Sequence, residues 1–185
     1  MKLASVRRRL GACTRCPLHA SRTQIVFGAG NPEADIVLVG EAPGAREDES
    51  GTPFVGAAGK LLDRMLDRIE LSRGDIYIAN VLKCRPPSNR NPRPAEIETC
   101  LPFLLDQLRA IRPRLVGTLG NFATRVLLQT RAGIGSLRGQ TFPVEEFTVL
   151  PMYHPAAALH NGGLRAEIES DFDRLRDALG PVHER

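Results

Sequence analysis

Short apolar runs alternate along the chain with longer segments in which apolar residues recur at helical spacing. The short runs, each bounded by Gly, Pro or polar residues, occupy residues 35–40, 76–82, 115–120 and 147–151. Their length and composition predict buried strands. Helices are predicted over residues 56–69, 95–110, 121–129 and 164–179, and Asn121 is expected to cap the third of them.

Strands that alternate with helices at this spacing favour a parallel sheet, because parallel strands need crossover connections. We therefore predict an α/β fold with three layers (α/β/α) and a central, mostly parallel four-stranded sheet. With 185 residues and 42% hydrophobic content, the chain can bury one sizeable core. It contains no internal repeat or linker, so residues 1–185 are expected to form a single domain.

The chain carries a formal net charge of +4, and arginine supplies most of its positive charge. Arginine suits bidentate contacts to phosphates and base edges, which points towards a nucleic-acid partner. Charge alone leaves a solvated basic surface as the alternative. No apolar run reaches membrane-spanning length and no secretory signal begins the chain, so we expect a cytoplasmic protein without a membrane partner.

Four cysteines are present, and a reducing compartment makes structural disulfides an unlikely use for them. Cys13 and Cys16 form a C-x-x-C pair, while Cys84 and Cys100 flank a Pro-rich loop and the start of a helix. Four soft ligands suit either a tetrahedral zinc ion or a [4Fe-4S] cluster, and their spacing does not choose between the two. Four unrelated buried thiols are the alternative.

Polar and aromatic residues lie at or just after the ends of three of the predicted strands. Glu41 and a loop reaching Phe54 follow the first strand, Asn80 belongs to the second, and His154 follows the last. Ligands of parallel sheets bind at the carboxyl ends of the strands, where these residues are expected to converge. The sequence therefore predicts one site that contains a carboxylate, an aromatic ring, an amide and an imidazole.

Several ordered motifs together resemble the family 4, iron–sulfur-containing branch of the uracil-DNA glycosylase superfamily. They are Cys13–Leu18, Gly40–Gly44, Glu47–Asp48, Gly51–Asp63, Asn80–Pro87 and His154–Ala157. The resemblance spans nearly the whole chain. It implies an enzyme that hydrolyses the N-glycosidic bond of deoxyuridine in DNA, releasing uracil and leaving an abasic site for base excision repair. It also implies a structural [4Fe-4S] cluster on Cys13, Cys16, Cys84 and Cys100.

The resemblance assigns three side chains to the flipped uracil, which must leave the base stack before it can react. Phe54 is expected to stack on the ring, worth about 1–3 kcal/mol. Asn80 carries the donor and the acceptor that read O4 and N3–H. His154 is expected to donate a hydrogen bond to O2 as a neutral imidazole. The alternatives are a core role for Phe54 and a turn-capping role for Asn80.

The loop after the first strand departs from the best-known branch of the superfamily. Ala42 occupies the position of an Asp that orients the attacking water, and Gly44 that of a Tyr that excludes thymine. Glu41 and Glu47 are the available carboxylates, and a general base contributes about 10²–10⁴-fold. Glu41 is expected at the site and Glu47 as the water's partner. The backbone of Gly40 and Ala42 is expected to line the uracil site.

Contacts to DNA are expected on both sides of this site. The segment that contains Ala157 and Leu159 resembles the wedge loop that enters the base stack, and Arg85 is a candidate phosphate contact. The substrate is expected to be uracil-containing single- or double-stranded DNA, and the protein is expected to be a monomer.

Three other functions fit the sequence. Because Ala42 removes the expected Asp, a module that binds a damaged base without cleaving it is one alternative. A metal-containing regulatory protein with a nucleotide-binding fold is the second, although the glycine loop matches no phosphate-binding fingerprint. A glycosylase for deaminated purines is the third.

Overall fold

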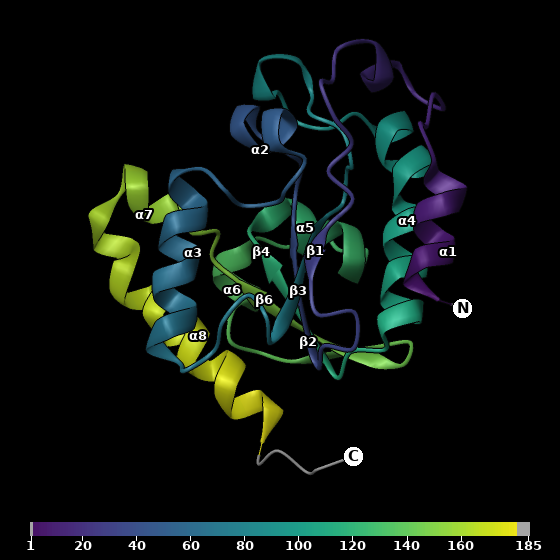
Figure 1. Cartoon of the computed structure of the whole chain (residues 1–185). Helices are drawn as coiled ribbons and strands as arrows, with labels where there is room; N and C mark the ends of the chain where they lie inside the picture. Colours follow the sequence, from purple (N-terminus) through teal and green to yellow (C-terminus); the bar gives the residue numbers. More distant parts are fainter. Residues whose placement is uncertain (1, 181–185) are drawn as a thin grey trace.

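The computed structural model describes residues 2–180 and contains a six-stranded mixed sheet in the order β1-β3-β2-β4-β6-β5 (Figure 1). The strands are β1 (Ala29–Gly30), β2 (Ile36–Gly40), β3 (Ile76–Asn80), β4 (Leu115–Leu119), β5 (Phe142–Val144) and β6 (Phe147–Met152). The four central strands, β3, β2, β4 and β6, run parallel, while β1 and β5 pair antiparallel at the two edges.

The predicted parallel strands are confirmed, but the predicted number of four strands is wrong. The prediction missed both edge strands, because two and three residues are too few to produce an apolar run. Strand β5 also contains Pro143, which an edge strand tolerates since one side of it pairs with no neighbour. The four central strands alone form the parallel sheet that the sequence predicted.

Helices cover both faces of the sheet, which confirms the three-layer α/β/α architecture (Figure 1). The longer ones are α1 (Leu3–Leu10), α3 (Ala57–Arg68), α4 (Pro94–Ile111), α5 (Asn121–Leu128) and α8 (Arg165–Leu179). The short ones are α2 (Ala45–Ser50), α6 (Ile134–Leu137) and α7 (Ala156–His160), with 3-10 turns at Pro17–Ala20, Pro87–Asn89 and Gly162–Leu164.

Each face of the sheet has its own apolar core. Alternate residues of a strand point to opposite faces, so Leu38 packs with residues of α3 and α8, while Val39 packs with residues of α4 and α5. All five residues of each of the strands β2, β3 and β4 are buried, as expected for strands covered on both sides. A third cluster joins α1 to α4.

Asn121 does not cap α5, contrary to the prediction. Gly120 holds the cap position with a φ of 90°, and Asn121 is the first helical residue. The Asn121 side chain instead accepts a hydrogen bond from the backbone N–H of Ile134, at 2.7 Å. Gly120 is needed there because a Cβ atom would lie 3.1 Å from the Cβ of His154. Among residues 2–180, no helix is long and apolar enough to cross a membrane.

Candidate active site

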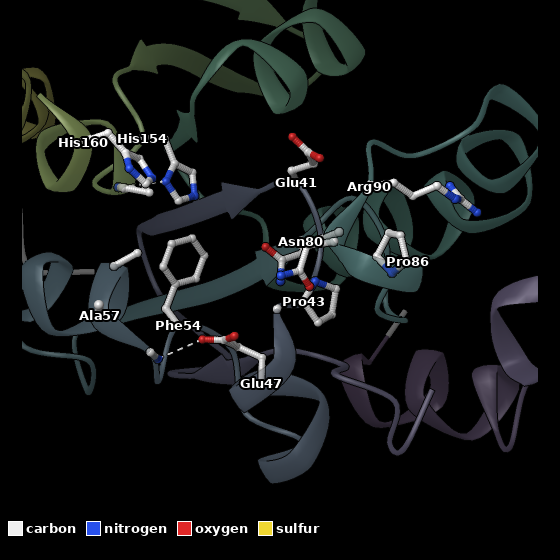
Figure 2. A pocket seen from close by; sticks show the side chains of 16 residues that line it. Glu41, Pro43, Glu47, Phe54, Ala57, Asn80, Pro86, Arg90, His154 and His160 are labelled. Carbon is white, nitrogen blue, oxygen red and sulfur yellow. Dashed lines mark hydrogen bonds between the residues drawn. The ribbon is translucent and has the colours of Figure 1, made fainter. Parts of the chain in front are cut away.

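A pocket of about 580 Å³ opens where the parallel strands end (Figure 2). The loops that follow β2, β3 and β6 form it, as expected for a parallel sheet. It is lined by Glu41, Ala42, Pro43, Gly44, Glu47, Phe54, Gly56, Ala57, Ala58, Asn80, Pro86, Asn89, Arg90, His154, Ala156 and His160. The structure thus brings Glu41, Phe54, Asn80 and His154 together from four separate parts of the chain.

Gly40 lets two of these side chains approach each other at the end of β2. It pairs with Asn80 in the parallel register of β2 and β3. A Cβ atom on Gly40 would lie 2.4 Å from the Asn80 Oδ1 atom and 2.9 Å from the ring of Phe54. Any larger residue at position 40 would therefore displace both side chains.

Asn80 is buried, with 2% of its surface exposed. Its Oδ1 atom has no hydrogen-bond partner among the described residues, and Gln107 has the one other buried side-chain atom of this kind. Buried polar atoms are nearly always paired in native proteins, because leaving one unpaired costs about 1–3 kcal/mol. An unpaired acceptor beside a pocket is therefore an attachment point for a ligand donor.

Phe54 lies in the loop between α2 and α3 and is 7% exposed. Its φ of 55° places the backbone in the left-handed region, which is uncommon for an aromatic residue. The ring rests against Gly40 and stacks on the His154 ring, with centroids 5.5 Å apart and an interplanar angle of 27°. Figure 2 shows the Phe54 ring between His154 and Glu47, close to Asn80.

His154 follows β6 and is held in one tautomer. The backbone N–H of Ala156 donates to His154 Nδ1 at 3.1 Å, so the ring proton lies on Nε2. Burial lowers the pKa of His154 to about 4, against the opposing effect of the Glu47 carboxylate. The imidazole is therefore neutral at pH 7 and offers an Nε2–H donor.

The two candidate carboxylates differ in their surroundings. Burial raises the pKa of Glu41 above its ordinary value, and no described residue donates a hydrogen bond to its side chain. Glu47, on α2, accepts hydrogen bonds from the backbone N–H groups of Val55 and Gly56, each at 2.9 Å to Oε1 (Figure 2). Glu41 is thus an unanchored carboxylate, while Glu47 holds the loop that carries Phe54.

A second, smaller pocket of about 270 Å³ adjoins the first and shares Glu41 and His154 with it. Its remaining lining includes the end of β4 and the start of α5. Glu41 therefore lies at the junction of two cavities, one on each side of the end of β2.

The residues predicted to contact DNA lie outside the lining of the main pocket. Leu159 belongs to α7, where sequence motifs predicted a loop, and it is 49% exposed, the one large apolar side chain in the described chain that is so exposed. Ala157 lies on the same helix. Arg85 donates to Asn89 Oδ1 at 2.8 Å on the exposed loop after β3.

Three residues of the pocket wall, Asn89, Arg90 and His160, lie outside the sequence motifs. His160 ends α7 and faces the pocket near His154, and only its place six residues after His154 hints at this. Asn89 has a φ of 53° in the loop after β3. Arg90 also lines the pocket, but both of its terminal nitrogens bond to the buried Glu96, at 3.0 and 2.6 Å. Its charge is therefore largely neutralised within the protein.

Cys13 and Cys16 lie in the N-terminal segment after α1, Cys84 in the loop after β3, and Cys100 on α4. Ionisation of Cys100 or Cys16 would raise the pKa of Cys84, and ionisation of Cys16 or Cys13 would raise that of Cys100, so the four lie in one neighbourhood. Within residues 2–180, no three or more His, Cys, Asp or Glu side chains are grouped so that they could hold a metal ion.

Donors surround three of the four sulfur atoms. Arg15 donates to Cys13 Sγ, Arg22 to Cys84 Sγ, and the Lys83 backbone N–H to Cys100 Sγ, each at 3.3 Å. Burial raises the pKa of the Cys84 thiol to about 11, so the free thiol is protonated. Four thiols, three of them with N–H donors to their sulfurs, are by their chemistry the donor set of an iron–sulfur cluster, whose properties depend on such bonds.

Comparison with known proteins agrees with this site. A family model described as the uracil DNA glycosylase superfamily matches residues 27–178. The chain is 46% identical to a type-4 uracil-DNA glycosylase of Archaeoglobus fulgidus, over 96% of this chain and 94% of that protein. It is 42% identical to a type-4 uracil-DNA glycosylase of Sulfurisphaera tokodaii, over 95% of this chain and 84% of that protein. It is 41% identical to a type-4 enzyme of Thermotoga maritima, over 94% of this chain and 93% of that protein.

The fold and the strand-end pocket, together with these matches, define a member of a base-excising superfamily. The chain belongs to the uracil DNA glycosylase superfamily, and within it to the type-4 uracil-DNA glycosylases. The resemblance inferred from the sequence motifs is thereby confirmed.

Proposed function

We propose that this protein hydrolyses the N-glycosidic bond of deoxyuridine in DNA, releasing uracil and leaving an abasic site. The unpaired Oδ1 of Asn80 carries the proposal, because uracil presents an N3–H donor to such an acceptor. Cytosine has no proton on N3 and carries an amino group where uracil has O4. One buried amide therefore distinguishes the two bases.

The flipped uracil would stack on Phe54 and contact the backbone of Gly40 and Ala42. Flipping costs roughly a few kcal/mol, and stacking on an aromatic ring returns about 1–3 kcal/mol. Phe54 is buried and its ring is already stacked on His154, so little side-chain entropy is lost when the base enters.

His154 would stabilise the leaving group. Negative charge develops on uracil O2 as the bond to C1′ breaks, and a preorganised donor lowers that barrier. The Ala156 N–H fixes the Nε2–H tautomer, and the low pKa keeps the imidazole neutral. A neutral donor with a fixed orientation stabilises charge without giving up its proton.

One of two carboxylates would orient the water that attacks C1′. The sequence favoured Glu47 for this role, but its Oε1 atom already holds two backbone N–H groups. Glu41 has no such bond, lies at the junction of two cavities and has a raised pKa. A carboxylate with a raised pKa is a stronger base, so the surroundings favour Glu41 as the base and Glu47 as a support.

A [4Fe-4S] cluster would be held by Cys13, Cys16, Cys84 and Cys100. When bound, it would supply a covalent cross-link between the N-terminal segment and the loop after β3, with no part in the hydrolysis. Freshly purified anaerobic protein should absorb near 400 nm and contain four irons per chain. Stoichiometric zinc in its place would contradict this assignment.

DNA would lie across the mouth of the pocket. The exposed Leu159 on α7 would enter the base stack, with Ala157 beside it, while Arg85 would contact a phosphate. We expect the chain to act as a monomer and as one domain. We also expect a cytoplasmic location, as predicted from the sequence.

The decisive experiment uses an oligonucleotide with a single uracil, followed by alkaline cleavage. Matched oligonucleotides with thymine, cytosine or hypoxanthine at the same position are the controls. We expect strand cleavage at uracil and none at cytosine. Binding of the uracil strand without release of uracil would instead indicate a recognition module, and faster cleavage at hypoxanthine would indicate a purine glycosylase.

A further inference from the structure

The loop that presents Phe54 holds a backbone conformation that it would not adopt on its own. A φ of 55° is uncommon for a residue with a bulky side chain, and such conformations persist only when surrounding groups enforce them. The position of the Phe54 ring against Gly40 and His154 depends on this conformation. The groups that hold residues 53–56 therefore determine the stacking geometry.

Arg73, in the connection between α3 and β3, holds the first half of this loop. Its guanidinium donates to the carbonyl oxygen of Pro53 at 3.0 Å and to that of Phe54. Its Nε atom bonds to Asp63 on α3 at 2.6 Å, which fixes the plane of the guanidinium. The planar fork of arginine thus spans two successive carbonyls, which a lysine ammonium does not match.

Glu47 holds the second half from the opposite side. Its Oε1 atom accepts the N–H groups of Val55 and Gly56. A cation therefore faces two successive carbonyls, and an anion faces the two N–H groups that follow them. Gly59 of α3 completes the enclosure, because a Cβ atom there would lie 1.8 Å from the Phe54 carbonyl oxygen.

We propose that Arg73 is a positioning residue for uracil excision, and that it acts by holding Phe54 in its stacking conformation. The proposal rests on the proposed function. Arg73 does not line the pocket and would not touch the base; it acts through Phe54. Misplacement of a positioned group by about 1 Å costs up to about 100-fold in rate, so a large effect is expected from this remote residue.

The test compares Arg73→Met, Arg73→Lys and wild type for uracil release from a single-stranded oligonucleotide. Arg73→Met should lower kcat/KM by roughly 10- to 100-fold and weaken inhibition by free uracil. Arg73→Lys should recover part of the loss, because an ammonium can bond only one carbonyl well. Arg68→Met is the matched control, since Arg68 forms an ion pair with Asp173 at 3.0 Å but touches no part of the loop.

A double-mutant cycle with Phe54→Ala separates positioning from general stabilisation. If Arg73 acts through Phe54, then Arg73→Met should change kcat/KM by less than about 3-fold when Phe54 is already Ala. An equal loss in both backgrounds would overturn the proposal. Failure of wild type to release uracil would instead refute the proposed function.

A second readout does not depend on catalysis. Hydrogen exchange of the Val55 and Gly56 amides should be faster in Arg73→Met than in wild type, because the loop is released on one side. Should Arg73→Met not fold, Asp63→Ala removes the acceptor of the Arg73 Nε–H group and should accelerate exchange of the same two amides. Unchanged exchange in a folded variant would contradict the proposal.

Discussion

The strand-end pocket and the cysteine region are assembled in different ways. The register of β2 and β3 places Gly40 beside Asn80, so buried strands fix the position of this pocket residue. Cys13, Cys16 and Cys84 lie outside the regular helices and strands and Cys100 lies on α4, and arginine and backbone N–H groups reach three of the four sulfur atoms. The pocket geometry therefore rests on the sheet itself, whereas the proposed cluster would add cross-links to the cysteine region.

Lys83 connects the two regions. Its side chain is buried, with 1% of its surface exposed, and its Nζ atom donates to the Asn80 carbonyl oxygen at 2.8 Å. Its backbone N–H donates to Cys100 Sγ. Burial lowers the pKa of Lys83 to about 8, against the opposing charge of Cys100. Lys83 therefore links the cysteine region to Asn80 through its backbone N–H on one side and its side chain on the other.

The largest effect should come from the pocket carboxylates. Glu41→Gln should lower the single-turnover rate by about 10²–10⁴-fold, because the amide cannot accept a proton from water. Glu47→Gln keeps an oxygen for the Val55 and Gly56 N–H groups, so its loss should be smaller. Wild-type rates in both variants would exclude acid–base help from this loop, and a larger loss in Glu47→Gln would restore the assignment made from the sequence.

His154→Ala should lower kcat by about 10²–10³-fold, the usual cost of removing one preorganised donor. Because the folded pKa is about 4, the wild-type rate should show no inflection near pH 6.5 caused by this residue. The same pKa is below that of the unfolded chain, so unfolding takes up a proton between about pH 4 and 6.5, and stability falls as pH falls through this window.

The His154→Ala variant tests the direction of this pH dependence of stability. His154→Ala should lose this contribution, so its stability should decline less than that of wild type between pH 6.5 and pH 4, as measured by chemical denaturation. An inflection near pH 6.5 in the wild-type rate that vanishes in His154→Ala would show instead that the imidazole titrates normally.

The smallest effect on activity should come from Lys83, which connects the pocket to the cysteine region. Lys83→Met keeps the length of the side chain but leaves the Asn80 carbonyl unpaired, which costs about 1–3 kcal/mol. We expect a lower melting temperature and reduced discrimination between uracil and cytosine, with the 400 nm absorbance retained. Unchanged discrimination would mean that the pocket is independent of the cysteine region. Arg22→Met is the control, because it loses a bond to Cys84 but touches no pocket residue and keeps Lys83. It should therefore leave the discrimination between uracil and cytosine unchanged.

The sequence by itself determined the sheet and the types of residue at its edge. Buried strands are continuous apolar runs, so β2, β3, β4 and β6 were recognisable, and Glu41, Asn80 and His154 stood out as polar residues where such runs end. The edge strands were not recognisable, because they are two and three residues long and pair on one side alone. Motifs, rather than periodicity, led to the family.

Only the tertiary structure decided how the site residues are held. In the sequence, Glu41 and Glu47 look like two equivalent glutamates between the first strand and Phe54. In the structure, Glu47 accepts hydrogen bonds from the backbone of residues 55 and 56, whereas Glu41 accepts none from the described residues. Arg73 lies nineteen residues after Phe54, and no local pattern links them. Contacts between distant segments depend on packing and on unpaired backbone groups, which sequence periodicity does not encode.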